Sequence, residues 1–129
     1  MRTIDIGIAD SWMKFTGSRN IPYLGVAAHL DWAEKNPQLV PKLYAAYKEA
    51  AEWVTAHPDE ASRLIAPKGT PDDQKAIADL VRANDRLGMN VKWASDVRKE
   101  INSVYAAGKS IAFLPSDPAA STIYQASGQ

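Results

Sequence analysis

The placement of prolines constrains the fold of this 129-residue chain more than any other feature. Between Pro37 and Pro58, apolar residues recur every three or four positions, a spacing that lines one face of an α-helix. Proline is tolerated in the first turn of a helix, and the residue before a proline is disfavoured in the α region. The sequence therefore predicts a long amphipathic helix over 37–56 and a second, short helix over 58–66.

Pro41 conflicts with the start of the long helix. If Asn36 is the cap, Pro41 is the fifth helical residue, where it removes a hydrogen bond and crowds the preceding turn at a cost of about 3 kcal/mol. Either the regular helix starts nearer Gln38 or its first turn is distorted. On the apolar face of this helix, Leu43 is the predicted core anchor.

Two further helices are predicted in the second half of the chain. Thr70 is a suitable cap, Pro71 follows it at the first helical position, and Gly88 is able to end the helix in the left-handed conformation. These signals predict a helix over 70–87. Apolar spacing predicts another over 95–107.

The N-terminal part has strand signals instead. Isoleucines alternate with smaller or polar residues over 3–8, and the apolar segment 21–27 carries Pro22 near its start, as edge strands do. Residues 10–20 show neither period and are predicted to form a loop, and 111–129 an irregular tail. The predicted fold class is α+β with helices dominant.

The central region carries a family resemblance. Four features form it: an acid-containing helix at 31–35, the step NPQLV at 36–40, an alanine-rich helix with an aromatic residue at 44–54, and HPDEAS at 57–62. They resemble the C-terminal half of ABC-importer solute-binding proteins, of the type II periplasmic binding proteins that take sulfonates, taurine, nitrate or the thiamine pyrimidine precursor. The resemblance covers 21–66 and continues more weakly to Tyr124.

The resemblance implies a two-lobed periplasmic-binding-protein-like α/β fold, and 129 residues are too few for both lobes. On this reading the chain is a fragment, with a strand and a hinge crossover in 1–28 and the helical C-terminal portion in 29–129. The first residues have one positive charge and no apolar run, so we expect no signal peptide here. The parent protein is expected to be periplasmic or otherwise extracytoplasmic.

Composition excludes several classes of function. Fifteen acidic residues balance fifteen basic ones, so bulk charge favours neither nucleic acid nor an anionic membrane as a partner. The chain has no cysteine, which excludes disulfides and thiolate chemistry.

The sequence shows no catalytic or metal-binding constellation. His29 and His57 have no second ligand at metal spacing, and neither a nucleophile elbow nor a phosphate loop is present. Asp72 and Asp73 follow a proline, where acids at a helix start are far commoner than a metal site or an acid–base pair. We therefore expect no enzyme activity, no metal and no cofactor.

Two aromatic residues are candidate ligand contacts. Trp12 lies beside Lys14 and near Arg19, a combination that suits a small anion or a flat ring. In the resembled proteins, loops of this kind face the cleft between the lobes, which adds Tyr23. The alternative is that Trp12 covers the edge of the fold. The resemblance also implies that most ligand contacts come from the absent N-terminal part.

Two functions remain open. The resemblance implies a non-enzymatic solute-binding component whose lobes close by a hinge and whose partners are a permease and an ATPase. The alternative is a stand-alone helical interaction module that docks through 30–68. On the fragment reading, strand edges and an apolar helix face that the missing half would cover predict self-association, whereas a monomer would favour the module.

Overall fold

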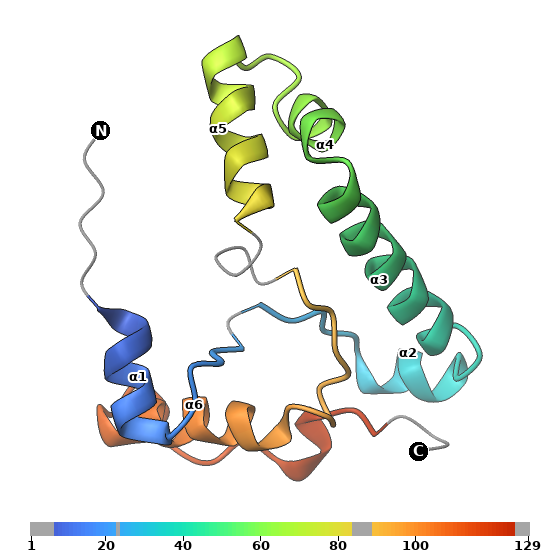
Figure 1. The fold of residues 1–129 in the computed structure, drawn as a ribbon. Helices are drawn as coiled ribbons and strands as arrows, with labels where there is room; N and C mark the ends of the chain where they lie inside the picture. Colours follow the sequence, from blue (N-terminus) through green and yellow to red (C-terminus); the bar gives the residue numbers. More distant parts are fainter. Residues whose placement is uncertain (1–6, 23, 84–88, 126–129) are drawn as a thin grey trace. The chain divides into compact units, whose positions relative to one another are not determined.

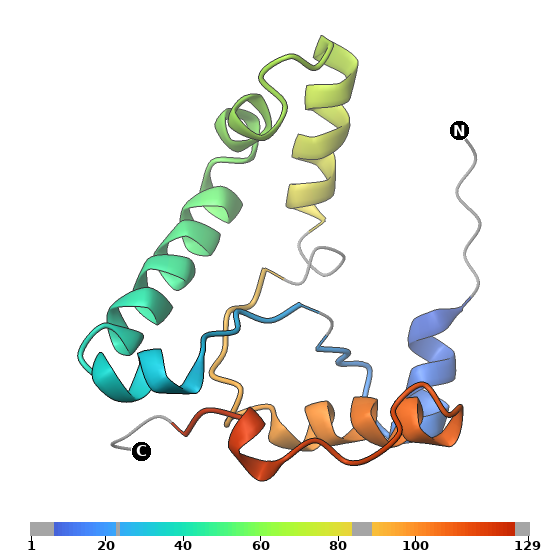
Figure 2. The same ribbon diagram turned by 180° about the vertical axis from the view of Figure 1, so that it is seen from behind.

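The computed structural model describes residues 7–22, 24–83 and 89–125, and within these ranges the regular structure is entirely helical. The chain divides into two compact units. One unit is built from residues 29–92, and the other from the segments before and after them. Figures 1 and 2 show the ribbon from opposite sides.

In its described residues, the unit formed by 29–92 contains four helices. They are α2 (Leu30–Lys35), α3 (Val40–Ala56), α4 (Pro58–Ile65) and α5 (Pro71–Arg82). α4 continues from the end of α3, and α5 returns beside α4 in both views (Figures 1 and 2). The predicted helices over 37–56, 58–66 and 70–87 are thus confirmed within the described residues, with corrections at their ends.

The predicted start of the long helix is wrong. α3 begins at Val40 after Leu39, so Pro41 lies in the first turn, where its missing N–H costs no helical hydrogen bond. Asn36 instead ends α2, since its backbone N–H and its side-chain amide both donate to the carbonyl oxygen of Trp32, at 3.0 and 2.9 Å. The conflict raised by Pro41 is resolved by a later helix start.

The predicted break at Pro58 is confirmed. His57 leaves the helical region of φ and ψ, with φ −127° and ψ 56°. It is both the C-cap of α3 and the N-cap of α4. Its backbone N–H donates to the carbonyl oxygen of Trp53 at 2.9 Å. Its ring stacks on the Trp53 indole with the ring centres 4.9 Å apart. The contacts between His57 and Trp53 thus hold the junction of α3 and α4 in place.

A capping box starts α5, with Thr70 as the predicted cap. Thr70 Oγ1 accepts from the backbone N–H of Asp73 at 3.2 Å, and the Asp73 carboxylate accepts from the backbone N–H of Thr70 at 3.0 Å. Hydrogen bonds from the Thr70 side chain and then from its backbone lower the pKa of Asp73. Asp73 is therefore a capping residue. The helix ends at Arg82, and Gly88 lies outside the described residues.

The core of this unit is made of small side chains. Its buried residues in the described ranges are Ala33, Ala51, Ala61, Ser62, Ala78 and Val81. Small residues at a helix contact let two helices approach closely, which suits the α4–α5 pair. The prediction that Leu43 anchors the core is wrong, because its side chain is 38% exposed.

The other unit contains α1 (Ile8–Thr16), α6 (Arg98–Ser110) and the short 3-10 helix η2 (Ala120–Thr122). The predicted loop over 10–20 is wrong over most of its length because α1 occupies it. Its apolar residues at steps of four and three form a helical face. Gly7 and Gly17 bracket the helix with left-handed φ values of 64° and 76°.

The predicted strands are absent from the described residues. Residues 3–6 lie outside the described ranges, and Ile8 begins α1. The predicted strand over 21–27 is wrong in its described part, which pairs with no other segment. A strand needs a partner to pair its backbone groups, and the described residues offer none. The helix-dominant part of the α+β prediction is confirmed, while the two-lobed fold remains a prediction.

The C-terminal segment folds back after α6. The backbone N–H groups of Phe113 and Leu114 donate to the carbonyl oxygen of Gly108, at 2.8 and 3.1 Å. A β-carbon at Gly108 would lie 3.1 Å from the Leu114 side chain, so glycine permits this close return. The Lys109 ammonium pairs with the Asp117 carboxylate at 2.5 Å. α6 starts three residues later than the predicted 95, because 94–97 form a turn.

Candidate functional site

The first candidate site surrounds Trp12 on α1. Its indole N–H donates to the carbonyl oxygen of Asn20 at 3.0 Å, and its ring meets Phe15 with the ring centres 6.1 Å apart. The side chain is half-buried. Because the one polar atom of the indole is used within the chain, the group left for a ligand is the aromatic surface.

Short hydrogen bonds fold the segment after α1 back onto the helix. The Thr16 hydroxyl lies 2.9 Å from the carbonyl oxygen of Trp12 and 3.1 Å from that of Ser18. The Ser18 hydroxyl accepts from the backbone N–H of Asn20 at 3.1 Å. These contacts hold the Asn20 carbonyl at the N–H edge of the indole, so the orientation of Trp12 is fixed by local structure.

The charges around Trp12 differ from the expected cationic pocket. Arg19 pairs with Asp10 at 2.6 Å, so its charge is compensated. Lys14 has no carboxylate partner in the described part of the chain. Tyr23 lies outside the described residues, and its predicted place beside Trp12 stays a prediction. Lys14 is therefore the cation of α1 that has no described carboxylate partner, but residues two positions apart on a helix do not face each other, so it does not lie beside the indole.

A second candidate site, which sequence reasoning missed, lies between α6 and the segment that follows it. Arg98, Asn102 and Tyr105 line a hollow of about 280 Å³, which Ile123 and residues 117–120 close from the other side. The spacing of the three polar residues, four and then three, is the signal that could have indicated a shared helix face. This hollow has polar and apolar walls, as small-molecule sites do.

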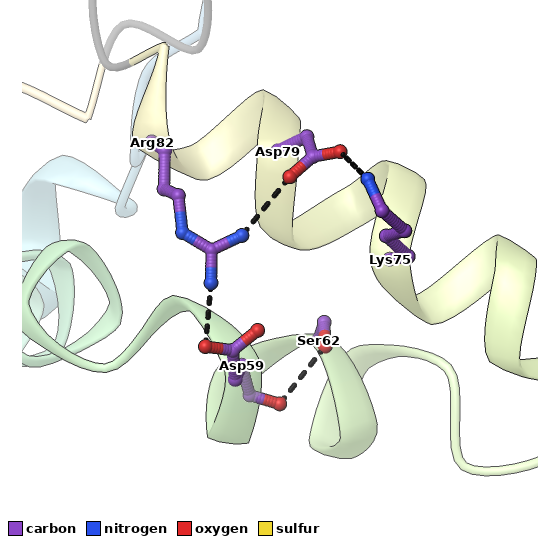
Figure 3. A network of polar contacts seen from close by, with 5 residues as sticks. All are labelled: Asp59, Ser62, Lys75, Asp79 and Arg82. Carbon is purple, nitrogen blue, oxygen red and sulfur yellow. Dashed lines mark hydrogen bonds and ion pairs between the residues drawn. The ribbon is translucent and has the colours of Figure 1, made fainter.

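A polar network joins α4 to α5 (Figure 3). Arg82 pairs with Asp59 at 2.5 Å and with Asp79 at 3.0 Å, and Lys75 pairs with Asp79 at 2.5 Å. The hydrogen bond from Lys75 lowers the pKa of Asp79, and the hydrogen bond to Asp59 raises the pKa of Arg82. Every charge in this network has an opposite partner. The network therefore serves to hold the two helices together.

Metal-binding groups and membrane-spanning helices are both absent from residues 7–22, 24–83 and 89–125. These ranges contain no group of three or more histidine, cysteine, aspartate or glutamate residues that could hold a metal ion. Within the same residues, no helix combines the length and the apolar character needed to cross a membrane.

One comparison with known proteins gives a match. A sequence model of the family described as NMT1/THI5 like matches residues 13–61, a stretch that begins in α1 and ends in α4. No curated protein and no solved structure matches the chain. The chain is thus similar to this family over less than half of its length.

The match coincides with the motifs that carry the resemblance. Residues 31–61 contain the acid-containing helix, the NPQLV step, the alanine-rich helix and most of HPDEAS. The family consists mainly of solute-binding proteins, and it also includes a member linked to pyrimidine synthesis. The match supports a substrate-binding role, in transport or in the supply of a thiamine precursor.

Proposed function

We propose that this chain is the C-terminal part of the solute-binding component of an ABC importer. Its solute is a small anion or a heteroaromatic ring, such as a sulfonate, nitrate or a pyrimidine precursor. The observation that carries the proposal is the family match over 13–61, which falls on the same residues as the sequence motifs. The protein binds its solute without chemical change.

The geometry around Trp12 supports this class of solute. A half-buried indole that is held by the Asn20 carbonyl offers a flat surface on which a ring stacks. Lys14 lies two residues later on α1 and on a different face of the helix, so it adds positive charge to α1 without lying beside the indole. We assign Trp12 and Tyr23 as ligand contacts of the complete site.

Both units bury few of their described side chains, which supports the proposal that a further part of the polypeptide completes the fold. In the described residues of the unit that holds α1 and α6, Ile123 is the one buried side chain. Many large apolar residues stay exposed, for example Leu24 at 85% and Phe113 at 79%. In the proposed parent, 1–28 contains the hinge crossover, 29–129 is the helical portion, and a preceding lobe covers these side chains.

The proposed parent works outside the cytoplasm and delivers its solute to a permease that an ATPase drives. Hinge closure of two lobes around the solute is the motion that this class of protein uses.

A helical interaction module is the second candidate. The observation that favours it is the exposure of apolar residues on α3, where Leu39 and Leu43 are each 38% exposed and Tyr47 is 49% exposed. Contiguous exposed apolar groups on a soluble protein mark interaction surfaces. Self-association through exposed helix faces is expected for the fragment, whereas a monomer would favour the module.

Calorimetric titration with taurine, nitrate and an aminopyrimidine tests the solute-binding proposal. The 129-residue chain alone is expected to show no micromolar affinity, because half a cleft lacks both contacts and preorganisation. The polypeptide encoded by the complete reading frame is expected to bind one of these solutes at micromolar concentration or below. Trp12→Ala is expected to weaken that binding by about tenfold or more, from the loss of ring contacts.

Trp32→Ala is the matched control, since Trp32 is 37% exposed on α2 and belongs to the other unit. It is expected to leave the affinity unchanged. Equal losses in both variants would remove Trp12 from the site. Absence of binding to any of the three solute classes by the complete polypeptide would favour the interaction module.

A further inference from the structure

An apolar stripe runs along α3 and the residue before it, and it stays exposed within the described part of its unit. Its members are exposed at steps of three and four residues: Leu39, Leu43, Ala46, Tyr47 and Ala50. α4 and α5 contact α3, and the one buried residue of this helix, Ala51, lies in its second half. The stripe is therefore a surface on which another helix is able to pack.

We propose that this stripe binds the same stripe of a second copy of the chain, with the two α3 helices antiparallel about a two-fold axis. A two-fold interface uses the same surface patch on both copies, so the patch must complement itself. The proposal rests on the side chains of α3 and does not depend on solute binding.

The apolar residues complement one another in a single register. When Leu43 lies opposite Ala46 of the second copy, Leu39 lies opposite Ala50 of that copy, because residue numbers run in opposite directions along the two helices. Two-fold symmetry repeats both contacts. Each leucine thus meets an alanine, and large-against-small pairing lets two helices approach closely and fill the space between them.

The charges that border the stripe fit the same register. Lys42 and Glu49 lie seven residues apart and therefore on the same side of the stripe. The register above brings Lys42 beside Glu49 of the second copy and Glu49 beside Lys42. Neither side chain has an ion pair in the described residues, whereas Lys48 and Glu52, on the far side of the helix, pair with each other at 3.9 Å.

The opposite border of the stripe is apolar and also complements itself. In this register Tyr47 lies beside Val40 of the second copy and Val40 beside Tyr47, while the two-fold axis passes between residues 44 and 45. Val40 is half-buried, and Tyr47 is 49% exposed. A parallel arrangement of two α3 helices loses this match, since it brings neither Lys42 nor Glu49 beside an opposite charge.

Charge complementarity selects a second copy as the occupant. Lys42 precedes Glu49 by about two helical turns. In an antiparallel pair, the α3 helix of the second copy therefore places its Glu49 beside Lys42 of the first copy. The formal net charge of zero adds no long-range repulsion between copies.

Sedimentation equilibrium of the 129-residue chain and its charge variants tests the proposal. The unmodified chain is expected to dimerise. Lys42→Glu alone and Glu49→Lys alone each replace two attractive pairs by two repulsive ones, which is expected to weaken the dimer on the order of tenfold. An equimolar mixture of the two variants restores both attractive pairs and is expected to dimerise as tightly as the unmodified chain.

Lys48→Glu and Glu52→Lys make the same charge changes on the far side of α3 and are the matched controls. They are expected to leave the dissociation constant within about twofold. A monomeric unmodified chain at 100 µM or above, as when another part of the chain covers the stripe, would overturn the proposal. So would single variants that dimerise like their controls, or a mixture that stays monomeric.

The absence of cysteine allows a second test at the axis. Ala46→Cys is expected to give a covalent dimer with a short bismaleimide, because Ala46 lies on the stripe next to the two-fold axis, which passes between residues 44 and 45. Lys48→Cys, two residues away and on the far side, is expected to stay uncrosslinked. Equal crosslinking of both variants would contradict the register.

Discussion

Replacing Ala78 by leucine is expected to destabilise the α4–α5 hairpin by about 1–3 kcal/mol. Ala78 on α5 and Ala61 on α4 are each 1% exposed, and the two helices lie against each other. A larger side chain at such a contact forces the helices apart or into strained rotamers. A small unit holds only a few kcal/mol in total, so this change is a large fraction of its stability.

Ala76→Leu makes the same chemical change on the exposed side of α5 and is the control. It is expected to alter the free energy of unfolding by no more than about 0.5 kcal/mol. Urea titration followed by circular dichroism measures both variants. Equal urea midpoints for the two would mean that α4 and α5 do not pack through their small residues.

Replacing Ile123 by alanine is expected to release the C-terminal segment from α6, at a cost of about 2–5 kcal/mol. Ile123 is 6% exposed, and it borders the same hollow as Arg98 and Tyr105 of α6. Trp93 and Tyr124 meet beside it with their ring centres 6.2 Å apart. No other described residue of this unit is buried, so the loss of its side chain removes the main apolar contact.

Amide hydrogen exchange of α6 reports this change locally. Ile123→Ala is expected to accelerate exchange of the α6 amides, because opening of the unit becomes less costly. Ile111→Ala removes the same atoms from a side chain that is 76% exposed and is expected to leave the exchange rates unchanged. Equal acceleration by both variants, or by neither, would show that Ile123 does not anchor this unit.

The helices around Pro58 and Thr70 were predictable because local chemistry decides them. A proline after His57 breaks the helix wherever the chain packs, and Thr70 with Asp73 closes a capping box within four residues. The start of α3 was mispredicted by three residues. Asn36 was predicted to be the N-cap of α3, but it is the C-cap of α2. Local signals fix the existence of a helix better than its first residue.

The errors in the N-terminal part have a different cause. α1 has nine residues, a length over which the spacing of Ile8, Trp12 and Phe15 is a weak signal, and the glycines at its ends suggest a loop. The segment 21–27 has the composition of a strand, but strand formation depends on a pairing partner elsewhere in the chain. Leu43 shows the same limit, because periodicity identifies a helix face and not what covers it.

The role of Trp12 stays a prediction, but the contacts that orient it were not predictable. In the sequence Trp12 lies near Lys14 and Arg19. The hydrogen bond from its indole to the Asn20 carbonyl and the pairing of Arg19 with Asp10 are contacts over eight and nine residues that composition does not reveal. The hollow beside α6 requires the return of residues 117–123, which no local pattern predicts.

The reading frame upstream of the Met1 codon tests the central proposal most directly. DNA sequencing across this region, with the intact mass of the protein from its natural source, shows whether a larger polypeptide is made. We predict an upstream in-frame segment with an export signal and a strand-rich lobe, and a mass well above 14.1 kDa. An in-frame stop codon directly upstream, together with a native mass of 14.1 kDa, would contradict the solute-binding proposal.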